Sequence, residues 1–371
     1  MIVVEYIGLS LIAIYSITIL SFAVGWLKLK PFNSLSNLNS IPVSIVIACR
    51  NEESNISQIL NSLTNQNYPK EHTEIIIVDD HSEDNTTKII NDYIHDYSYI
   101  KLFKLPQKKT GKKEALAFGI SEAKSEIIVT SDADCTMQQK WLSSLVGYYV
   151  QNKPKMIIAP VTFGKSKNVF QKFQTLEFLS LIGAGAGAIG INRAIMCNGA
   201  NLLFEKSLYK EANLQNNLAS GDDIFLMLHT KKINRKSVHF IKSKEAIVYT
   251  KVTTDVRSFF NQRIRWTSKS KAYRDFDIIY TAGIVALTNL TLAASLIYSF
   301  VNFTHLNFFL SLLIIKSIFD IIILIPVTKF FQQQNLLWLF FPLQIIYPSY
   351  ITTTVIFGLL GNFNWKNRKY H

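Results

Sequence analysis

The chain has 371 residues, of which 49% are hydrophobic and 12% aromatic, and its formal net charge is +13. This length suits one ordinary soluble domain together with a substantial membrane portion. A basic surface can attract nucleic acid, an anionic lipid leaflet or a phosphorylated substrate, but the chain shows no zinc finger, recognition-helix pattern or RNA-binding motif, so nucleic acid is not expected as a partner. The cysteines lack the paired spacing of a disulfide framework or a zinc site: Cys49, Cys135 and Cys197.

The N-terminal segment, residues 1–30, predicts a membrane anchor. Residues 6–27 are apolar and long enough to span a bilayer, with Glu5 before them and Lys28 and Lys30 directly after them. A cleaved signal peptide has the opposite arrangement, with its positive charge ahead of the apolar run. By the positive-inside rule, these lysines and the domain that follows them lie in the cytoplasm. We therefore expect an integral protein of the cytoplasmic (inner) membrane whose main domain faces the cytoplasm.

Residues 42–275 carry the pattern of an α/β domain. Short apolar runs rich in β-branched residues alternate with segments of helical character. This alternation predicts right-handed crossovers and a mainly parallel sheet with helices on both faces. Ligands of such sheets bind at the carboxyl ends of the strands. Strands are expected at 43–49, 74–78, 100–105 and 126–130, and helices at 56–63, 86–95 and 112–123.

Acidic residues fall where these strands end. Asp132 and Asp134 follow the strand expected at 126–130. Two carboxylates one residue apart at a strand end can share a hard divalent cation and the diphosphate attached to it. An Asp-x-Asp sequence alone also occurs in many exposed turns. Its position after a buried strand favours a site for a metal and a phosphorylated ligand.

Seven short segments extend this pattern through the domain. They read SIVIACRNEE at 44–53, IVDDHSED at 77–84, GKKEAL at 111–116, SDADC at 131–135, NGAN at 198–201, GDD at 221–223 and QRIRW at 262–266. In this order they resemble the motifs of the membrane-bound family 2 glycosyltransferases, including cellulose- and hyaluronan-synthase-type and ceramide-glucosyltransferase-like members. The resemblance covers residues 43–273. It implies a GT-A fold, a nucleotide-sugar donor such as a UDP-sugar, Mg²⁺ or Mn²⁺ as cofactor, and inversion at the transferred sugar.

The resemblance also implies roles on the donor side. Glu52 and Asp80 would hold the nucleotide base and ribose, and Lys112 would lie beside the diphosphate. Asp132 would contact the ribose or sugar and share the metal, while Asp134 would be the main metal ligand. Each of these residues stands at a position that matches the family's motifs.

Further roles concern catalysis and the acceptor. Asp223 matches the family's general base, and Asp222 stands where many members have Glu, which leaves its own role open. An acceptor hydroxyl is a poor nucleophile near neutral pH, so a carboxylate must take its proton during attack. The motif at 262–266 would pack over the donor diphosphate and the acceptor, and the segment at 198–201 would line the acceptor site. The residues concerned are Gln262, Arg265 and Trp266, and Asn198, Gly199, Ala200 and Asn201.

Residues 276–371 predict a second membrane region with two to four helical segments. Spans are expected at 278–301 and 306–328, and the second carries Lys316 and Asp320 four residues apart on one helix face. These two either form a buried structural pair or hold a lipid head group. Residues 336–361 contain Pro342 and Pro348, which favours a re-entrant hairpin or two short helices that return the basic tail (Lys366, Arg368 and Lys369) to the cytoplasm.

The glycine-rich segment at 170–191 suits close packing or an interfacial helix better than a span. The motif at 262–266 lies about a dozen residues before the next span, within roughly 20 Å of the bilayer by helix geometry. We therefore expect a membrane-associated, lipid-linked acceptor. The main alternative is a processive polysaccharide synthase. A nucleotidyltransferase would need a glycine-rich pyrophosphorylase loop, which is not evident, and a catalytically dead scaffold would be expected to lack one of the motif residues.

Overall fold

The computed structural model describes residues 2–33, 40–212, 214, 221–360, 363–365 and 368–370. They form two units that interleave along the chain. The sheet unit consists of Leu29–Gly164 and Met196–Lys251, and the helical unit of Met1–Lys28, Lys165–Ile195 and Val252–His371. The domain expected at 42–275 is therefore interrupted, because two of its segments pack with the membrane helices instead.

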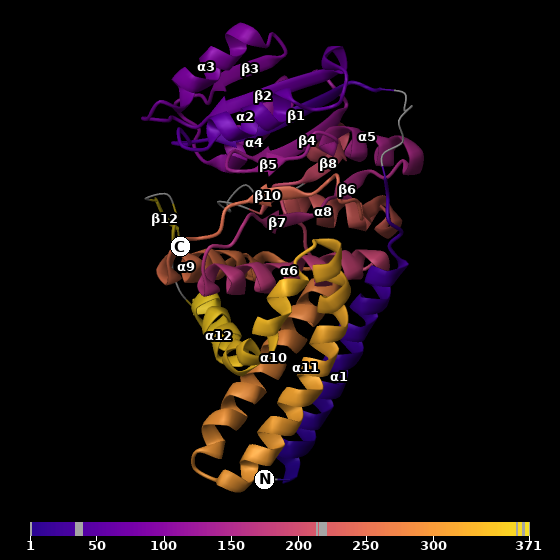
Figure 1. The fold of residues 1–371 in the computed structure, drawn as a ribbon, viewed down its shortest axis with the longest axis vertical. Coiled ribbons are helices and arrows are strands. Elements are labelled where there is room, and N and C mark those ends of the chain that lie inside the picture. Colours follow the sequence, from indigo (N-terminus) through magenta and orange to yellow (C-terminus); the bar gives the residue numbers. More distant parts are fainter. Residues whose placement is uncertain are drawn as a thin grey trace. The chain divides into compact units, whose positions relative to one another are not determined.

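The sheet unit contains a seven-stranded sheet in the order β3-β2-β1-β4-β8-β6-β9 (Figure 1). The neighbours from β3 to β4 are parallel, and so are β6 and β9, whereas β8 runs antiparallel to β4 and β6. The expected mainly parallel sheet is confirmed, and β6, β8 and β9 are the strands of this sheet that the sequence did not predict. The strands are β1 (Val43–Cys49), β2 (Thr73–Asp79), β3 (Ile100–Lys104), β4 (Ile127–Asp132), β6 (Met156–Ile158), β8 (Leu202–Glu205) and β9 (Val238–Phe240).

Helices and a small second sheet complete this unit. Gly119 of α4 brings its helix onto β1 and β2, since a Cβ at this position would lie 2.6 Å from Val46 and 2.9 Å from Val78. The first three expected helices are confirmed. The helices are α2 (Ile56–Thr64), α3 (Thr86–Asp96), α4 (Lys112–Glu122), α5 (Trp141–Asn152), α7 (Lys206–Glu211) and α8 (Asp222–Ile233). The second sheet has the order β5 (Thr136–Met137), β10 (Val248–Thr250), β7 (Val161–Phe163), and the 3-10 turns are η1 (Lys70–His72) and η2 (Arg235–Ser237).

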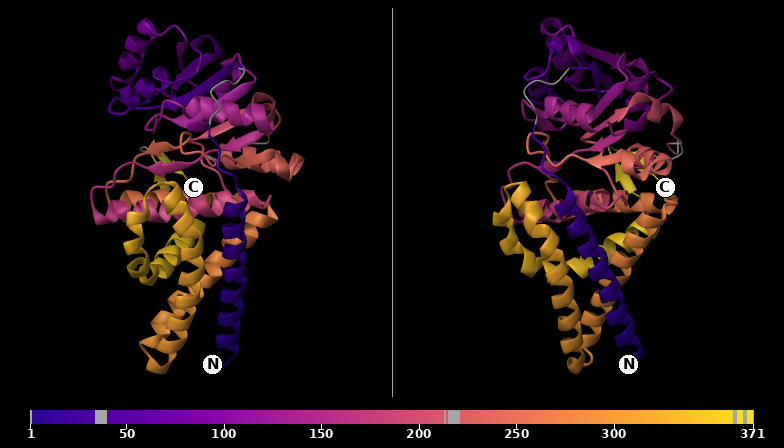
Figure 2. Two further views of the ribbon diagram at one scale, coloured as in Figure 1. Left: turned by 45° about the vertical axis from the view of Figure 1, so that its right-hand side comes forward. Right: turned by 90° about the vertical axis from the view of Figure 1, so that its right-hand side faces the viewer.

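Long helices make up the helical unit. α1, α10 and α11 pack against one another along their length, and α6 runs across one end of this bundle (Figures 1 and 2). The helices are α1 (Ile2–Lys28), α6 (Val169–Gly190), α9 (Val256–Ser268), α10 (Phe276–Ser299), α11 (Leu306–Phe330) and α12 (Phe340–Leu360), with 3-10 turns η3 (Lys269–Ala272), η4 (Phe303–His305) and η5 (Gln334–Leu339) and a hairpin of β11 (Phe363–Trp365) and β12 (Arg368–Tyr370).

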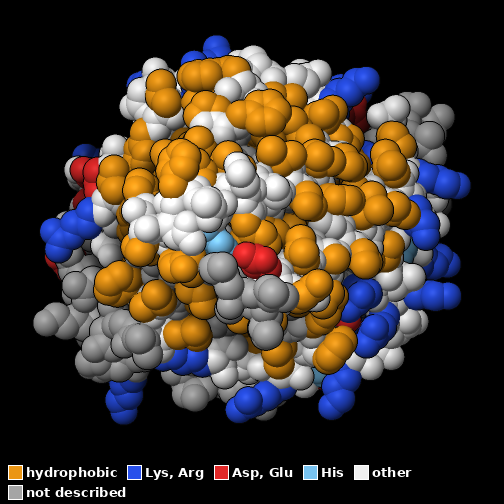
Figure 3. All heavy atoms as spheres, turned by 90° about the horizontal axis from the view of Figure 1, so that it is seen from below, with side chains coloured by type: hydrophobic (Ala, Val, Ile, Leu, Met, Phe, Trp, Pro, Cys, Tyr) orange, Lys and Arg blue, Asp and Glu red, His pale blue; other side chains and the backbone are white. Residues whose placement is uncertain are grey.

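Four helical segments of this unit are long and apolar enough to cross a membrane. Large apolar side chains remain exposed along them, for example Ile17, Ile297 and Phe303, each at least two-thirds exposed. Apolar side chains also cover the central part of the face seen in Figure 3. Exposed apolar surface of this extent marks contact with lipid or with another apolar body. The segments are Glu5–Lys28, Phe276–Ser299, Phe303–Phe330 and Gln334–Leu359.

Glycines bring α1 and α6 into backbone contact. A Cβ on Gly25 would lie 1.9 Å from the carbonyl oxygen of Gly187, and a Cβ on Gly187 would lie 2.2 Å from that of Phe22. A Cβ on Gly190 would in turn lie 2.1 Å from the carbonyl oxygen of Gly25. Small residues allow such close approach between apolar helices. The close-packing interpretation of the segment at 170–191 agrees with these contacts.

The last apolar segment corrects one of two alternatives. Two short helices are absent, because α12 is assigned as one helix with Pro348 in its interior, whereas a re-entrant segment remains in agreement with the contacts of its two ends. Pro342 lies in the first turn, where its missing N–H removes no helical hydrogen bond. η5 packs against α6, and Gly358 near the end of α12 meets Thr267 of α9, so both ends of this segment lie against the α6–α9 layer. Lys366 lies outside the described residues, and only the backbone of Arg368 and Lys369 is described.

The predicted pair of Lys316 and Asp320 forms inside α11. The Lys316 ammonium lies 2.5 Å from the Asp320 carboxylate and 3.0 Å from Oε1 of Gln344, and the Lys316 side chain is completely buried. The Tyr15 hydroxyl donates to Asp320 at 2.6 Å. These contacts join α1, α11 and α12. Of the two interpretations left open, the buried structural pair describes this geometry.

Candidate donor site and motif helix

The carboxyl ends of the central strands meet at one edge of the sheet. The register pairs Cys49 with Asp79 and Ala48 with Asp132, so β1, β2 and β4 end side by side. The loops that follow these strands carry Glu52, Asp80 and Asp134. Polar residues that are far apart in the sequence therefore gather at the edge where ligands of parallel sheets bind.

Loops after β1 and β2 hold each other in place. The backbone N–H of Asn51 donates to Ser82 Oγ at 2.9 Å, and that of Asn85 donates to Glu53 Oε2 at 3.0 Å. Glu52 accepts a hydrogen bond of 2.6 Å from the side chain of Asn55. Glu53 thus joins the two loops, and so does the backbone N–H of Glu52, which donates to the Thr86 hydroxyl at 2.8 Å.

Asp80 binds the turn that directly precedes α4. Its side chain is buried, Oδ2 accepts from the Gly111 N–H at 2.9 Å, and Oδ1 accepts from the Thr110 hydroxyl at 3.3 Å. Gly111 has a φ of 100°, which side chains other than glycine rarely tolerate. This turn fixes the first residue of α4, Lys112. Asp80 therefore positions the lysine that was expected beside a diphosphate.

Lys112 lies at the centre of a charged cluster. Its ammonium lies 2.5 Å from Asp132 Oδ1. Burial by itself lowers the pKa of Lys112, but the charges of Asp132, Asp222 and Asp223 outweigh it and raise the pKa overall. The lysine therefore stays protonated at neutral pH. The structure brings together residues from α4, the end of β4 and the start of α8.

Asp134 is the acid whose ionisation this cluster most disfavours. Burial, followed by the negative charges of Asp132 and Glu52, raises the pKa of Asp134 to about 6. Oδ2 accepts a hydrogen bond of 3.4 Å from the Thr250 hydroxyl. A cation beside this carboxylate would relieve the repulsion. Among the residues that the structure describes, no three His, Cys, Asp or Glu side chains are grouped so as to hold a metal ion.

Asp223 contacts the segment that was expected to line an acceptor site. It lies in the first turn of α8, and its Oδ2 accepts from the Gly199 N–H at 3.0 Å. Gly199 is held from the other side because its carbonyl oxygen accepts from the Thr130 hydroxyl of β4 at 3.1 Å. A Cβ at Gly199 would lie 3.3 Å from the Asp223 carboxylate. The expected base and the segment at 198–201 are therefore neighbours.

Asn201 has a structural role instead of the expected one. Its side chain is completely buried. Its amide donates to the carbonyl oxygens of Pro160 and Ala246, both at 2.8 Å, and its oxygen accepts from Trp141 Nε1 at 2.9 Å. These bonds use both amide hydrogens, and burial keeps the side chain away from an acceptor. Ala200 is also buried, so only Asn198 and Gly199 of this segment are partly exposed.

Residues 44–211 match the family model described as Glycosyl transferase family 2. The match covers less than half of the chain, so it is this stretch that is similar to the family 2 glycosyltransferases. It is 27% identical over 251 residues to the poly-beta-1,6-N-acetyl-D-glucosamine synthase of Staphylococcus epidermidis, covering 65% of this chain and 58% of that protein. It is 26% identical over 289 residues to the probable glycosyltransferase YdaM of Bacillus subtilis, covering 76% of this chain and 67% of that protein. The chain thus spans somewhat over half the length of that synthase.

A solved structure has the same fold. The mannosyltransferase PcManGT from Pyrobaculum calidifontis, in complex with GDP-Man and Mn²⁺, aligns with a TM-score of 0.59 at 19% identity, over 96% of this chain and 99% of that one. The glycosyltransferase domain therefore has the GT-A fold, as the sequence predicted.

The remaining expected site residues lie in the helical unit, on α9. Gln262, Arg265 and Trp266 are partly exposed there, while Arg263 between them is buried. Arg263 forms an ion pair with Glu177 of α6. Sequence reasoning gave Arg263 no role. Its one signal was Glu177, a lone acid in the apolar segment at 170–191, which needs a cation as partner when buried.

Proposed function

We propose that this chain is an inverting, metal-dependent glycosyltransferase that moves a sugar from a nucleotide-sugar donor to a membrane-associated, lipid-linked acceptor. The observation that carries the proposal is the cluster of Lys112, Asp132, Asp134 and Asp223 around the carboxyl ends of the central strands. A lysine is suited to a diphosphate, and carboxylates are suited to a divalent cation and to an acceptor proton.

The acidic residues fit a divalent cation of the magnesium type. Mg²⁺ is commonly bound by one or two carboxylates together with substrate phosphates, so two aspartates suffice. Asp134 is the main candidate ligand, because its repulsion by neighbouring acids calls for a counter-charge. Asp132 is shared with Lys112 at 2.5 Å. When bound, Mg²⁺ or Mn²⁺ would supply positive charge to the leaving diphosphate.

Asp223 is suited to the role of general base. During attack its carboxylate takes the proton of the acceptor hydroxyl, while the new bond forms between the acceptor oxygen and the anomeric carbon. The bond from that carbon to the diphosphate oxygen breaks on the opposite face, which inverts the sugar. Lys112 offers its charge to the departing diphosphate. The Gly199 N–H bond, at 3.0 Å, restricts the Asp223 side chain to one orientation.

Membrane association supports a lipid-linked acceptor. Four segments are long and apolar enough to cross a bilayer, and the motif helix α9 ends eight residues before the first residue of α10. By the positive-inside rule, Lys271 and Arg274 place this junction in the cytoplasm. An acceptor that is itself held in the membrane meets such a protein without leaving the bilayer.

A processive polysaccharide synthase is the second candidate. The observation in its favour is the similarity to the staphylococcal poly-beta-1,6-N-acetyl-D-glucosamine synthase, at 27% identity over 65% of this chain. Both candidates use the same donor chemistry. They differ in the length of the product and in whether the product remains soluble in organic solvent.

The experiment supplies radiolabelled UDP- and GDP-sugars, with Mn²⁺, to the purified chain in vesicles of native lipid, and then extracts the product with organic solvent. Label in a short glycolipid is the expected result. Label confined to a long polymer that the solvent does not extract would contradict a lipid-linked acceptor and support the synthase. Vesicles with Asp223→Asn protein control for transfer by contaminants.

A further inference from the structure

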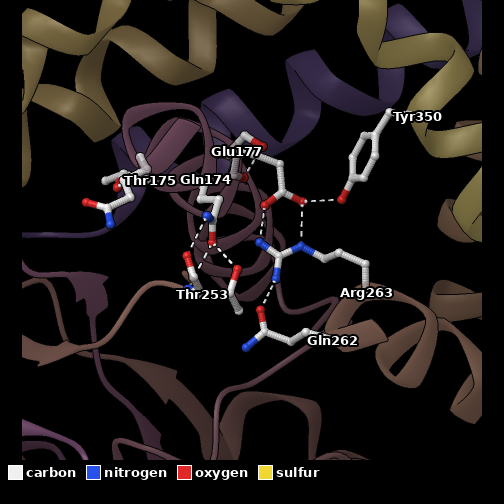
Figure 4. Close-up of polar contacts among 9 residues, drawn as sticks. Gln174, Thr175, Glu177, Thr253, Gln262, Arg263 and Tyr350 are labelled. Atoms are coloured by element: carbon white, nitrogen blue, oxygen red, sulfur yellow. Dashed lines mark hydrogen bonds and ion pairs between the residues drawn. The ribbon is translucent and has the colours of Figure 1, made fainter. Parts of the chain in front are cut away.

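Arg263 is the buried centre of a polar cluster between α6, α9 and α12. Its Nη2 lies 2.5 Å from Glu177 Oε2, and its Nε donates to Glu177 Oε1 at 3.2 Å (Figure 4). The two side chains are only 4% and 3% exposed. This two-point contact fixes the plane of the guanidinium as well as its position.

The same guanidinium contacts two residues of the glycosyltransferase motif. Nη1 donates to Gln262 Oε1 at 2.5 Å, and the guanidinium carbon lies 4.3 Å from the centroid of the Trp266 ring. Because arginine can only donate, the Gln262 oxygen must face Arg263, and the Gln262 amide nitrogen must face away from it. Arg263 therefore sets both the direction of the Gln262 amide and the placement of the indole.

Helix α12 contributes the third side of the cluster. The Tyr350 hydroxyl donates to Glu177 Oε1 at 3.1 Å, and the Tyr350 ring stacks on Phe259 of α9 with centroids 5.5 Å apart. Glu177 thus accepts from both Arg263 and Tyr350. The orientation of the motif on α9 depends on one acid of α6 and one hydroxyl of α12.

Because the ion pair of Arg263 and Glu177 is buried, the cluster is sensitive to the loss of either partner. Burial lowers the pKa of Arg263, but Glu177 outweighs this and raises it, so the arginine remains charged. A buried ion pair adds little net stability when intact, whereas removal of one partner leaves an uncompensated charge. An ion pair of this kind contributes more to the orientation of its side chains than to the stability of the folded protein.

We propose that Arg263 is a positioning residue for sugar transfer, held in place by Glu177 and Tyr350, and that it acts through Gln262 and Trp266. The inference rests on the proposed function, since the motif's role in transfer belongs to that proposal. It adds three residues, two of them outside the motif, on which turnover depends. It also explains why an acidic residue is kept in the apolar helix α6.

The test measures turnover per donor-binding site in native-lipid vesicles, with the sites counted by titration with labelled nucleotide. Arg263→Lys keeps the charge for Glu177 but loses the planar contacts with Gln262 and Trp266. We expect turnover per site to fall by about 10- to 100-fold, the effect of a displacement of about 1 Å in a positioning group. A purely structural role would reduce the number of sites and leave turnover per site unchanged.

Matched variants complete the test. Arg257→Lys makes the same change at an exposed position of α9 and is expected to keep wild-type turnover. Tyr350→Phe removes one hydroxyl from the cluster and is expected to lower turnover per site by a smaller factor. If Arg263→Lys does not fold, the turnover of Tyr350→Phe tests the positioning role in its place. Wild-type turnover per site in the folded cluster variants would overturn the inference. Absence of transfer by the wild-type chain would instead remove the proposed function on which it rests.

Discussion

At the scale of single residues, Asp223 offers the sharpest prediction. Asp223→Asn keeps the size of the side chain and its ability to accept from Gly199, but the amide cannot take a proton at neutral pH. Turnover should fall by about 100-fold or more, the usual size of a general-base effect. Donor affinity should stay close to that of the wild type. Steady-state kinetics and equilibrium binding of a labelled donor measure the two quantities.

Asp92→Asn is the matched control for this change. Asp92 is exposed on α3, outside the charged cluster, so its variant should retain wild-type turnover. Normal transfer by Asp223→Asn would assign the base elsewhere. The neighbouring Asp222 would then be the first candidate, because it also faces Lys112.

Asp134 carries the prediction about metal. If it binds a cation that also contacts the donor diphosphate, chelation should abolish transfer by the wild type and weaken its donor binding. Asp134→Ala should lack transfer, and its weaker donor binding should no longer respond to chelator. Glu53→Gln is the control, since Glu53 joins two loops by accepting from Asn85, a bond that glutamine retains. If chelator leaves the donor affinity of the wild type unchanged, that result would contradict a metal in this site.

The sequence predicted individual residues well where a motif names them and poorly where burial decides. Lys112, Asp132, Asp134 and Asp223 were expected at one site, and the structure places them together because strand ends meet at one sheet edge. Asn201 belongs to a motif, yet its amide is used up inside the protein.

Arg263 shows the opposite failure of sequence reasoning. It lies inside the motif at 262–266, but its partner Glu177 is 86 positions away along the chain. No local pattern connects residues that a tertiary contact brings together. Only the isolation of Glu177 among apolar residues indicated that a partner had to exist.

At the scale of elements, buried parallel strands were the most predictable part. Runs such as 43–49 are apolar except for Ser44 because both faces of the sheet are covered, and the expected strand ends lie within two residues of those in the structure. β6, β8 and β9 were missed because each is only three or four residues long, and their pairing depends on tertiary context. Of the two alternatives for residues 336–361, two short helices were wrong because α12 accommodates Pro348 in its interior.

The contact between α1 and α6 makes a prediction at this scale. Gly187→Ala would place a Cβ 2.2 Å from a backbone oxygen of α1, which cannot move without separating the helices. We expect a lower thermal unfolding temperature in detergent, even though alanine favours a helix over glycine by about 0.5–1 kcal/mol. Gly283→Ala in α10 is the control, because a Cβ there meets no atom within 4 Å. That variant should unfold at the wild-type temperature or slightly above it, and equal temperatures for both variants would contradict the packing role.

At the scale of the whole molecule, the chain passes repeatedly between its two units. The segments Lys165–Ile195 and Val252–His371 belong with the anchor Met1–Lys28, although the sequence between them builds the sheet unit. A boundary at 275 was expected because apolar composition changes there. Helices α6 and α9 pack with the other helices of this unit while retaining charged residues, so composition alone did not reveal the division. Motifs of the glycosyltransferase domain consequently fall in both units.

Orientation in the membrane is the last prediction. Lys271 and Arg274 precede α10 and Lys329 ends α11, whereas residues 300–305 between these helices contain no lysine or arginine. The positive-inside rule therefore places this turn outside and α9 in the cytoplasm. Single cysteines can test this, since Val301 in the turn is 82% exposed and Val256 on α9 is 56% exposed. Of the native cysteines, Cys49 and Cys135 are buried, and Cys197→Ser removes the third.

In intact protoplasts or spheroplasts, a membrane-impermeant maleimide should label Val301→Cys at once. It should label Val256→Cys only after the membrane is permeabilised, because the reagent cannot reach the cytoplasmic side. The parent chain with Cys197→Ser alone should stay unlabelled in both conditions. Labelling of Val256→Cys in intact cells would place α9 outside. Cytosolic nucleotide sugars could then not reach the same face as the motif, and the proposed transfer reaction would have to be abandoned in its present form.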